Sequence, residues 1–181
     1  EVRIETIDCP RPQAIEKAVA DFKAEVAASI GKVAGDNDLP ETWQNQVASI
    51  DELHAEAAKV APALKGIVTS AAGETGQPYF GEGDKFLTKS RESLERKVAG
   101  LVEDGASQAQ AVAGIGDSVR GTIIADKPEA VGSIARNLTE QVHAAGGRVV
   151  FDNKWEKHTR GQYSAVHADV FLPSPSGKRI K

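Results

Sequence analysis

The chain contains few of the residues that stabilise small folds through disulfide bonds or bulky core side chains. It contains one cysteine, Cys9, and no methionine, and aromatic residues make up 5% of its 181 residues. A single cysteine excludes an intrachain disulfide, so the fold does not depend on an oxidising compartment. The scarcity of aromatic side chains favours a core of small aliphatic residues between helices. Because methionine is missing even at the first position, we expect a processed product or a piece of a longer protein.

Long apolar runs, targeting signals and the common nucleotide motifs are also missing. No apolar run approaches the roughly 20 residues that span a bilayer, and no secretory signal pattern opens the chain. We therefore expect no membrane partner and a cytoplasmic location, or delivery into a target cytoplasm if the chain is a toxin domain. The motifs G-x-x-x-x-G-K-[ST], G-x-G-x-x-G and G-x-S-x-G are absent, which excludes the usual phosphate loops and the serine nucleophile turn.

The charge of the chain is modest and uneven. Lys and Arg number 22 against 26 Asp and Glu, for a formal net charge of −4. This balance excludes the basic face of a general DNA-binding protein. Two basic clusters nevertheless occur, at 85–97 and 148–160, and together they indicate a local anion site such as one for a polyphosphate. Each cluster taken alone is equally typical of a solvated surface.

Two amphipathic helices are predicted in the first part of the chain. Apolar residues recur at spacings of three and four over 13–34 and again over 41–61, which is the period of a helix with one buried face. Pro62 is expected to kink or stop the second helix, because proline lacks the main-chain N–H that a helix interior needs.

The glycine-rich segment 73–84 reads as a linker. It leads us to expect an α-helical region at 1–76 and an α/β domain at 77–181. Within the second region, β-branched runs and helical periods predict a mixed sheet flanked by helices. The expected elements are a helix at 87–102, a strand at 119–125, a helix at 127–145 and strands at 148–151, 163–172 and 178–181.

A first candidate site lies in the sequence KSRESLERK. Lys89, Ser93 and Lys97 are spaced i, i+4 and i+8, which on a helix places two ammonium groups and a hydroxyl along one face. Such a row can contact successive phosphates of a nucleotide. The alternative is a surface helix, in which Glu92 and Arg96 form an ion pair one turn apart.

A second candidate is Asp117, at the entry to the predicted strand 119–125. A carboxylate at the end of a strand, beside a phosphate site, is a natural ligand for Mg²⁺, which takes one or two protein carboxylates and completes its shell with phosphate and water. The alternative is an ordinary turn residue, because Gly116-Asp117-Ser118 is typical of a turn.

A third candidate lies along the predicted strand 163–172. Tyr163, Ala165 and His167 share one face of that strand, and the tyrosine could stack on a base. The alternative is a core tyrosine beside a histidine with a structural partner. Three nearby cations could take phosphate groups: Lys154, Lys157 and Arg160.

The three motifs occur in the order and at about the spacings found in the RelA/SpoT family of alarmone synthetases. TKSRESLERKV resembles the family's K-S-x-E-S-x-x-R-K helix, GIGDSVRGTII resembles its D-[LI]-x-G-x-R segment, and FDNKWEKHTRGQYSAVHADV resembles its loop and G-Y-x-S-x-H strand. The resemblance covers about residues 85–181 and implies an α+β fold of the nucleotidyltransferase type.

The resemblance also implies a Mg²⁺-dependent pyrophosphokinase. It would transfer pyrophosphate from ATP to the 3′-hydroxyl of a purine nucleotide, such as GDP, GTP, ADP or ATP, or to the 3′ end of tRNA. Asp117 would hold Mg²⁺ and serve catalysis, and Tyr163 and His167 would hold the acceptor. A toxin-type member would also imply a neutralising or regulatory protein partner. The residues implied to bind the donor or neutralise phosphate are Lys89, Ser93, Lys97, Arg120, Lys154, Lys157 and Arg160.

The chain departs from the family pattern at positions that bear on activity. Leu87 stands where the family has an arginine that stacks on adenine, and Gln162 separates Gly161 from Tyr163. The family's catalytic glutamate would follow Lys181, so we expect the domain to be cut before its last catalytic strand. Two alternatives stay open: a nucleotide-binding module without turnover, and a structural or interaction module of the same fold.

Overall fold

A mixed sheet of six strands forms the centre of the fold. The computed structural model describes residues 1–5, 14–31, 35–36, 39, 43–154 and 165–181. The strands are β1 (Val2–Glu5), β2 (Gly76–Tyr79), β3 (Gly121–Ala125), β4 (Arg148–Asn153), β5 (Val166–Pro173) and β6 (Arg179–Ile180). The helices are α1 (Ala14–Ile30), α2 (Ile50–Ala72), the short 3-10 helix η1 (Glu82–Asp84), α3 (Arg91–Glu103), α4 (Gln108–Ala113) and α5 (Ala130–Ala144).

β1 joins the two halves of this sheet. The strand order is β2–β3–β1–β5–β4, and β6 pairs with β5. β1 runs parallel to β3 but antiparallel to β5, while β2 is antiparallel to β3 and β4 is antiparallel to β5. The sheet is therefore mixed, as predicted.

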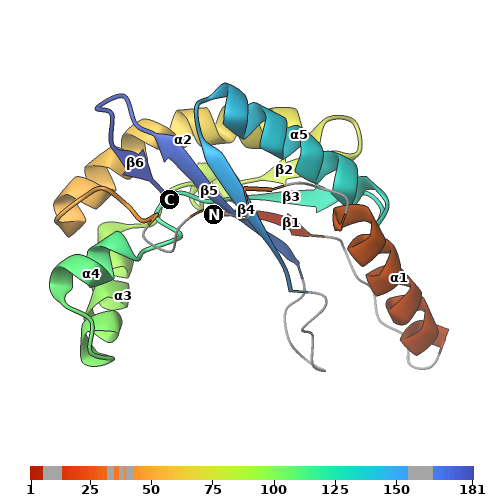
Figure 1. Ribbon diagram of the computed structural model, residues 1–181, viewed down its shortest axis with the longest axis horizontal. Coiled ribbons are helices and arrows are strands. Elements are labelled where there is room, and N and C mark those ends of the chain that lie inside the picture. Colours follow the sequence, from red (N-terminus) through yellow and green to blue (C-terminus); the bar gives the residue numbers. More distant parts are fainter. Residues whose placement is uncertain (6–13, 32–34, 37–38, 40–42, 155–164) are drawn as a thin grey trace.

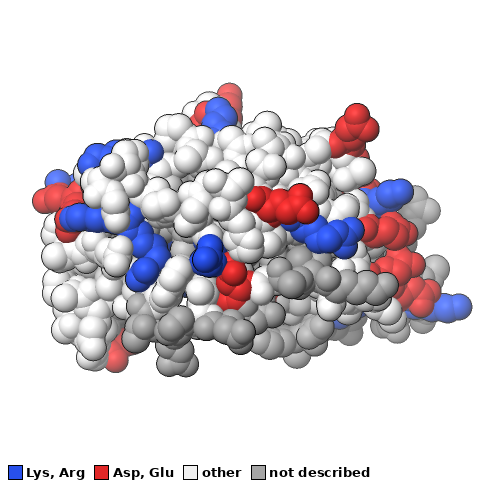
Figure 2. All heavy atoms as spheres, turned by 45° about the horizontal axis from the view of Figure 1, so that its top comes forward, with Lys and Arg blue, Asp and Glu red and all other residues white. Residues whose placement is uncertain are grey.

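Two helices cover one face of the sheet. Figure 1 shows α2 and α5 above the strands, and they pack on each other and on β3. Their apolar stripes meet the sheet in a core that includes Leu53, Val68, Ile123, Ile134 and Leu138, all fully buried. In Figure 2, acidic and basic side chains are scattered over the visible surface with both signs mixed, so this view shows no patch of one sign.

The opposite face of the sheet is more open. In Figure 1, α3 and α4 lie below one end of the sheet and α1 lies below the other. Among the residues that the structure describes, no helix lies under the middle of this face. The fold thus leaves a strand surface between two helical flanks, which we call the open face.

The first region is not purely helical, contrary to the prediction. Val2–Glu5 forms a strand that is hydrogen-bonded to β3 and β5 of the second region. Val2 is fully buried. Residues 1–76 and 77–181 therefore contribute to one sheet and one core. The period-2 alternation of β1 is only four residues long, which is too short to distinguish a strand from a frayed terminus by pattern alone.

α2 also differs from its prediction at both ends. It begins at Ile50 rather than near residue 41, because Ser49 caps it by accepting a hydrogen bond from the Glu52 N–H at 3.2 Å. It then continues through Pro62 to Ala72. Pro62 lies on the exposed side of the helix, where the carbonyl that it leaves unpaired can bind water. The buried stripe along the other side outweighs the roughly 3 kcal/mol cost of an interior proline.

The predictions beyond residue 84 are largely confirmed. The expected order strand–helix–strand–strand–strand is the observed order β3–α5–β4–β5–β6. α5 buries Ile134, Leu138 and Val142 and ends at Gly146, whose φ of 75° is the left-handed conformation that terminates helices. The expected linker 73–84 contains an edge strand, β2, where Pro78 is tolerated because one side of the strand has no partner strand in the described part of the chain.

Candidate functional site

Polar side chains form a row across the open face. The strand registers place Tyr79, Thr122, Arg3, His167 and Asp152 directly opposite one another on five successive strands. Residues paired in this way project to the same side of a sheet. The residues just before and just after these in each strand point to the opposite, helical face, where most of them are buried. One face therefore supplies the core, and the other presents charged and aromatic groups.

Asp117 reaches the end of this face through a pairing that was not predicted. The extended segment 86–89 runs antiparallel to 117–120, with a bridge between Thr88 and Val119. Main-chain hydrogen bonds of 2.9 Å close the pairing on both sides of that bridge. This short ladder brings the chain just before α3 beside the chain just before β3.

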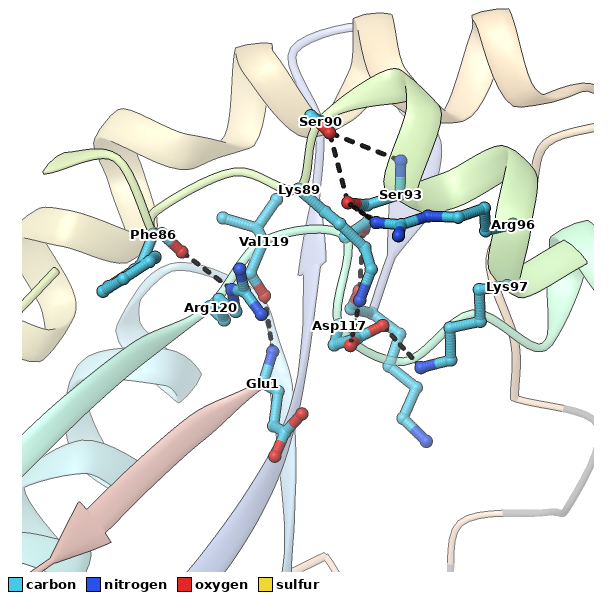
Figure 3. Close-up of polar contacts among 12 residues, drawn as sticks. Glu1, Phe86, Lys89, Ser90, Ser93, Arg96, Lys97, Asp117, Val119 and Arg120 are labelled. Carbon is cyan, nitrogen blue, oxygen red and sulfur yellow. Dashed lines mark hydrogen bonds and ion pairs between the residues drawn. The ribbon is translucent and has the colours of Figure 1, made fainter. Parts of the chain in front are cut away.

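α3 carries Lys97 toward the same point. The helix begins after Ser90, whose hydroxyl oxygen accepts a hydrogen bond from the Ser93 N–H at 3.3 Å. Leu94 and Val98 are buried and fix the orientation of the helix, so that Lys97, on the second turn, points to the loop before β3 (Figure 3).

Three predicted residues meet in one cluster, which we call the lysine–aspartate cluster. The Lys89 Nζ donates to Asp117 Oδ2 at 2.6 Å, and the Lys97 Nζ donates to Asp117 Oδ1 at 2.7 Å. Figure 3 shows both ammonium groups pointing at the one carboxylate. The Asp117 and Lys89 side chains are 12% and 13% exposed, whereas that of Lys97 is 41% exposed. The cluster thus combines two positive charges and one negative charge at a partly shielded edge.

The lysines keep Asp117 ionised. Burial by itself would raise the pKa of Asp117, but the hydrogen bonds and positive charges of Lys89 and Lys97 outweigh it and lower the pKa from the ordinary 3.8 to about 2. At neutral pH the cluster therefore carries a net charge of about +1, because two ammonium groups face one carboxylate.

Buried polar groups hold the loop that carries Asp117. The Asn45 Nδ2 donates to the carbonyl of Ile115 at 2.6 Å, and the Asn45 Oδ1 accepts from the Lys181 N–H at 2.7 Å. Ser118, which is fully buried, donates through its hydroxyl to the Lys181 carbonyl at 3.2 Å. These bonds tie the loop before β3 to the segment around Asn45 and to the end of the chain, so the position of Asp117 is set by tertiary contacts.

The predicted row on one helical face is wrong in one respect. Lys89 precedes the helix, in the extended segment before Ser90, and so is not one turn from Ser93. The Ser93 hydroxyl oxygen accepts from the Arg96 Nη2 at 3.1 Å and lies 3.2 Å from the Ser90 hydroxyl. None of the hydrogen bonds described for Ser93 reaches Asp117.

Only some residues of the third motif lie in the part of the chain that the structure describes. Lys157, Arg160 and Tyr163 lie outside the described residues. Lys154 follows β4 and pairs with Asp152, away from the lysine–aspartate cluster.

His167 lies in the middle of the open face, on β5. Its Nδ1 is 3.2 Å from the Glu1 Oε1. Burial lowers the pKa of His167 below its ordinary value of 6.5, more than the Glu1 carboxylate raises it. The imidazole is therefore mostly neutral at pH 7, and its Nε2 atom is buried.

Asp117 could hold Mg²⁺ only if phosphate groups of a ligand supplied other oxygens around the ion. Asp117 is the one predicted metal ligand, and both its oxygens are bound by lysines. Among the described residues, no group of three or more His, Cys, Asp or Glu is arranged to hold a metal ion. Mg²⁺ commonly binds through a single carboxylate plus phosphate oxygens and water. An ionised Asp117 fits that role once its lysines turn to phosphate.

Next to the cluster lies a cavity of about 290 Å³ whose aromatic walls the sequence prediction missed. It opens among β1, β2, β3 and the turn before Lys89. The side chains of Tyr79 and Phe86 are 48% and 42% exposed and form part of its wall. The Arg120 Nε donates to the Phe86 carbonyl at 2.9 Å, and the guanidinium lies 5.8 Å from the Phe86 ring centroid. The sequence signal was a pair of aromatics on either side of a Gly-rich turn, with Tyr79 inside the segment taken for a linker and Phe86 just after it.

Comparison of the chain with family models, with curated proteins and with solved structures finds no match. In the part of the chain that the structure describes, no helix is both long and apolar enough to cross a membrane.

Proposed function

We propose that this chain is a nucleotidyltransferase-like α+β domain that binds ATP and transfers its pyrophosphoryl group to the 3′-hydroxyl of a purine nucleotide or of a tRNA end. The observation that carries the proposal is the lysine–aspartate cluster. Lys89 and Lys97 were selected from one motif and Asp117 from another, up to 28 residues away, and each lysine Nζ lies within 2.7 Å of an Asp117 carboxylate oxygen.

The charges of the cluster suit a triphosphate. In the chain without ligand, the two ammonium groups share one carboxylate. A triphosphate carries more negative charge than Asp117, so it would compete for both lysines, which act as point charges. Asp117 would then be released to bind Mg²⁺, which would neutralise charge that builds up on the phosphates during transfer. The exposure of Lys97 leaves it free to turn toward such a ligand.

The proposed transfer breaks one bond and forms one. The 3′-oxygen of the acceptor attacks the β-phosphorus of ATP, the bond from that phosphorus to the α–β bridging oxygen breaks, AMP leaves, and the hydroxyl proton passes to solvent or to a nearby base. The protein's part is to position the donor and the acceptor in line and to supply positive charge. His167 lies on the open face where an acceptor would sit, and in this proposal its partly exposed ring contacts the acceptor and helps to hold it.

The direct test is product formation. The chain would be incubated with ATP, Mg²⁺ and one acceptor at a time: GDP, GTP, ADP or uncharged tRNA. We expect AMP in equal amount to pyrophosphorylated acceptor, and loss of both with Lys89→Ala. Arg136→Ala, which removes an exposed cation on α5, is the matched control. Absence of AMP with every acceptor would falsify the transfer reaction.

A second candidate is a nucleotide-binding module without turnover, and one observation favours it. Both Asp117 oxygens are already bound by lysines, which is an arrangement for binding anions rather than a vacant metal site. This candidate predicts that ATP binds with similar affinity with and without Mg²⁺ and that no AMP forms. Calorimetric titration with ATP in EDTA and in Mg²⁺, on the same samples, distinguishes the two functions.

A further inference from the structure

We infer that Tyr79 and Phe86 form a stacking site for the base of the bound nucleotide, and that this site accepts purines and pyrimidines with little selection. The inference rests on the proposed nucleotide binding and adds to it the subsite for the base. Its basis is the cavity of about 290 Å³ lined by these two rings and by Arg3, Arg120 and Thr122. Small-molecule pockets begin at about 300 Å³, so this one suits a base with its ribose rather than a whole nucleotide.

The backbone holds Phe86 at the mouth of this cavity. The Phe86 N–H donates to the Phe80 carbonyl at 2.7 Å, which closes the turn between them. Gly81 has a left-handed φ of 79°, and a Cβ at that position would lie 2.4 Å from the Phe86 Cδ2. The ring is therefore packed over a glycine that no other residue could replace without displacing it. An exposed aromatic ring fixed in this way needs little further ordering when a ligand stacks on it.

The rings and cations around the cavity suit the faces of a base. Tyr79 and Phe86 meet at a centroid distance of 6.3 Å with their planes tilted by 57°, so they form two adjoining walls rather than a slot. The Arg120 guanidinium lies 5.8 Å from the Phe86 ring centroid and adds a planar group to the wall of the cavity. Bases stack on aromatic side chains and on arginine planes in many nucleotide sites.

The cavity and the lysine–aspartate cluster lie at opposite ends of one short ladder. Phe86 and Arg120 are at one end of the pairing between 86–89 and 117–120, and Lys89 and Asp117 are at the other. Figure 3 shows Phe86 and Arg120 on one side of this ladder and Asp117 with Lys97 on the other. Three residues of extended chain span roughly 10 Å. A ribose and the first phosphates bridge an interval of this size, so one nucleotide can occupy both places.

The cavity has few groups that could read the edge of a base. The described residues that line it include no carboxylate and no carboxamide, which are the usual partners of exocyclic amino groups. Its two arginines already have protein partners: the Arg120 Nε donates to the Phe86 carbonyl, and the Arg3 Nε donates to the Glu1 Oε1 at 2.9 Å. Strong discrimination requires a hydrogen-bonding group committed to one base. Stacking supplies affinity without it, because every base has an aromatic face.

The test compares nucleotides with a phosphate chain that has no base. Dissociation constants would be measured by calorimetry for ATP, GTP, CTP, UTP and inorganic tripolyphosphate at one salt concentration. We expect the four nucleotides to agree within about tenfold, and tripolyphosphate to bind about five- to a hundredfold more weakly, which is the contribution of one stacked base. Phe86→Ala should remove most of that difference and leave tripolyphosphate unchanged. Tyr79→Ala should do the same to a smaller extent.

Two further variants keep the result interpretable. Phe86→Leu retains an apolar side chain without a ring and should behave like Phe86→Ala, and circular dichroism would verify that each variant is folded. Val102→Ala truncates another exposed apolar residue, on α3, and should bind every ligand as the unaltered chain does.

Each other outcome contradicts the base site, its lack of selection or the nucleotide binding itself. If tripolyphosphate binds as tightly as ATP, or if both ring variants bind ATP unchanged, the base site is wrong while the phosphate site stands. A preference above about tenfold for one base would overturn the lack of selection. If neither nucleotide nor tripolyphosphate binds, the proposed function fails together with the inference.

Discussion

The two faces of the sheet are built from the same strands and serve different ends. On the helical face, Ile123 and Val2 are fully buried under α2 and α5. On the open face, their chain neighbours Thr122 and Arg3 stand in a polar row that leads to Tyr79 on one side and His167 on the other. A strand alternates sides at every residue. Each strand can therefore secure the fold with one half of its side chains and leave the other half available for a ligand.

The sharpest way to test this division is a pair of substitutions at adjacent positions of β3. Ile123→Ala removes a fully buried side chain from the helical face and should lower the free energy of unfolding by about 2–5 kcal/mol. Thr122→Ala changes the open face and should alter it by no more than about 0.5 kcal/mol. Urea unfolding followed by circular dichroism measures both. Equal losses for the two variants would mean that the open face is part of the core.

The next largest effect is expected at the lysine–aspartate cluster, which belongs to the open face but is partly buried. Asp117→Asn leaves the shielded Lys89 without its counter-charge, and should cost about 1–3 kcal/mol of unfolding free energy. Asp84→Asn is the control, because the Lys65–Asp84 ion pair is exposed, with both side chains 44% accessible. A pair of that kind contributes about 0–1 kcal/mol. If the two variants are equally stable, the cluster does not contribute to the fold.

Acid should weaken the same contacts. The pKa of Asp117 is lowered to about 2 in the folded chain, from an ordinary value of 3.8. A carboxylate with a lowered pKa contributes stability above its unfolded pKa and loses that contribution as the pH falls toward the folded value. We expect a loss of up to about 2 kcal/mol between about pH 4.5 and pH 2 from this residue. The pH dependence of unfolding in Asp117→Asn should be flatter over that window by the same amount.

The smallest effect is expected from changing Ser90, the residue that caps the start of α3. Ser90→Ala removes the hydroxyl that accepts the Ser93 N–H at the start of α3, at a cost of about 1 kcal/mol. Lys97, two turns further on, is held by the buried Leu94 and Val98 rather than by the cap, so tripolyphosphate affinity should fall by less than about tenfold, the equivalent of 1.4 kcal/mol. A larger loss in calorimetric titration would show that the cap itself positions Lys97.

Local patterns in the sequence were sufficient to predict the helices and strands that depend on residues close together in the chain. The apolar stripe Ile134, Leu138 and Val142 predicted α5, and β-branched runs predicted β3 and β4, because period and propensity are properties of a short window. The cap signal Ser49-x-x-Glu52 could also have set the start of α2. The choice of Lys89, Lys97 and Asp117 as neighbours came from a family resemblance, and the sequence alone offered no distance between them.

The tertiary structure decided the features that depend on pairing between distant segments. β1 became the central strand because β3 and β5 offered it hydrogen-bonding edges, more than 110 residues away in the chain. Pro62 stayed inside α2 because the sheet buries the other side of that helix. The pairing of 86–89 with 117–120 joined the two lysines to Asp117 and set Phe86 beside Arg120. By itself, the sequence determined the helices and strands with a clear local pattern, such as α5, β3 and β4, and which motifs carry charge. Contacts between distant segments decided which of those charged residues meet, and such contacts produce no periodic pattern in the sequence.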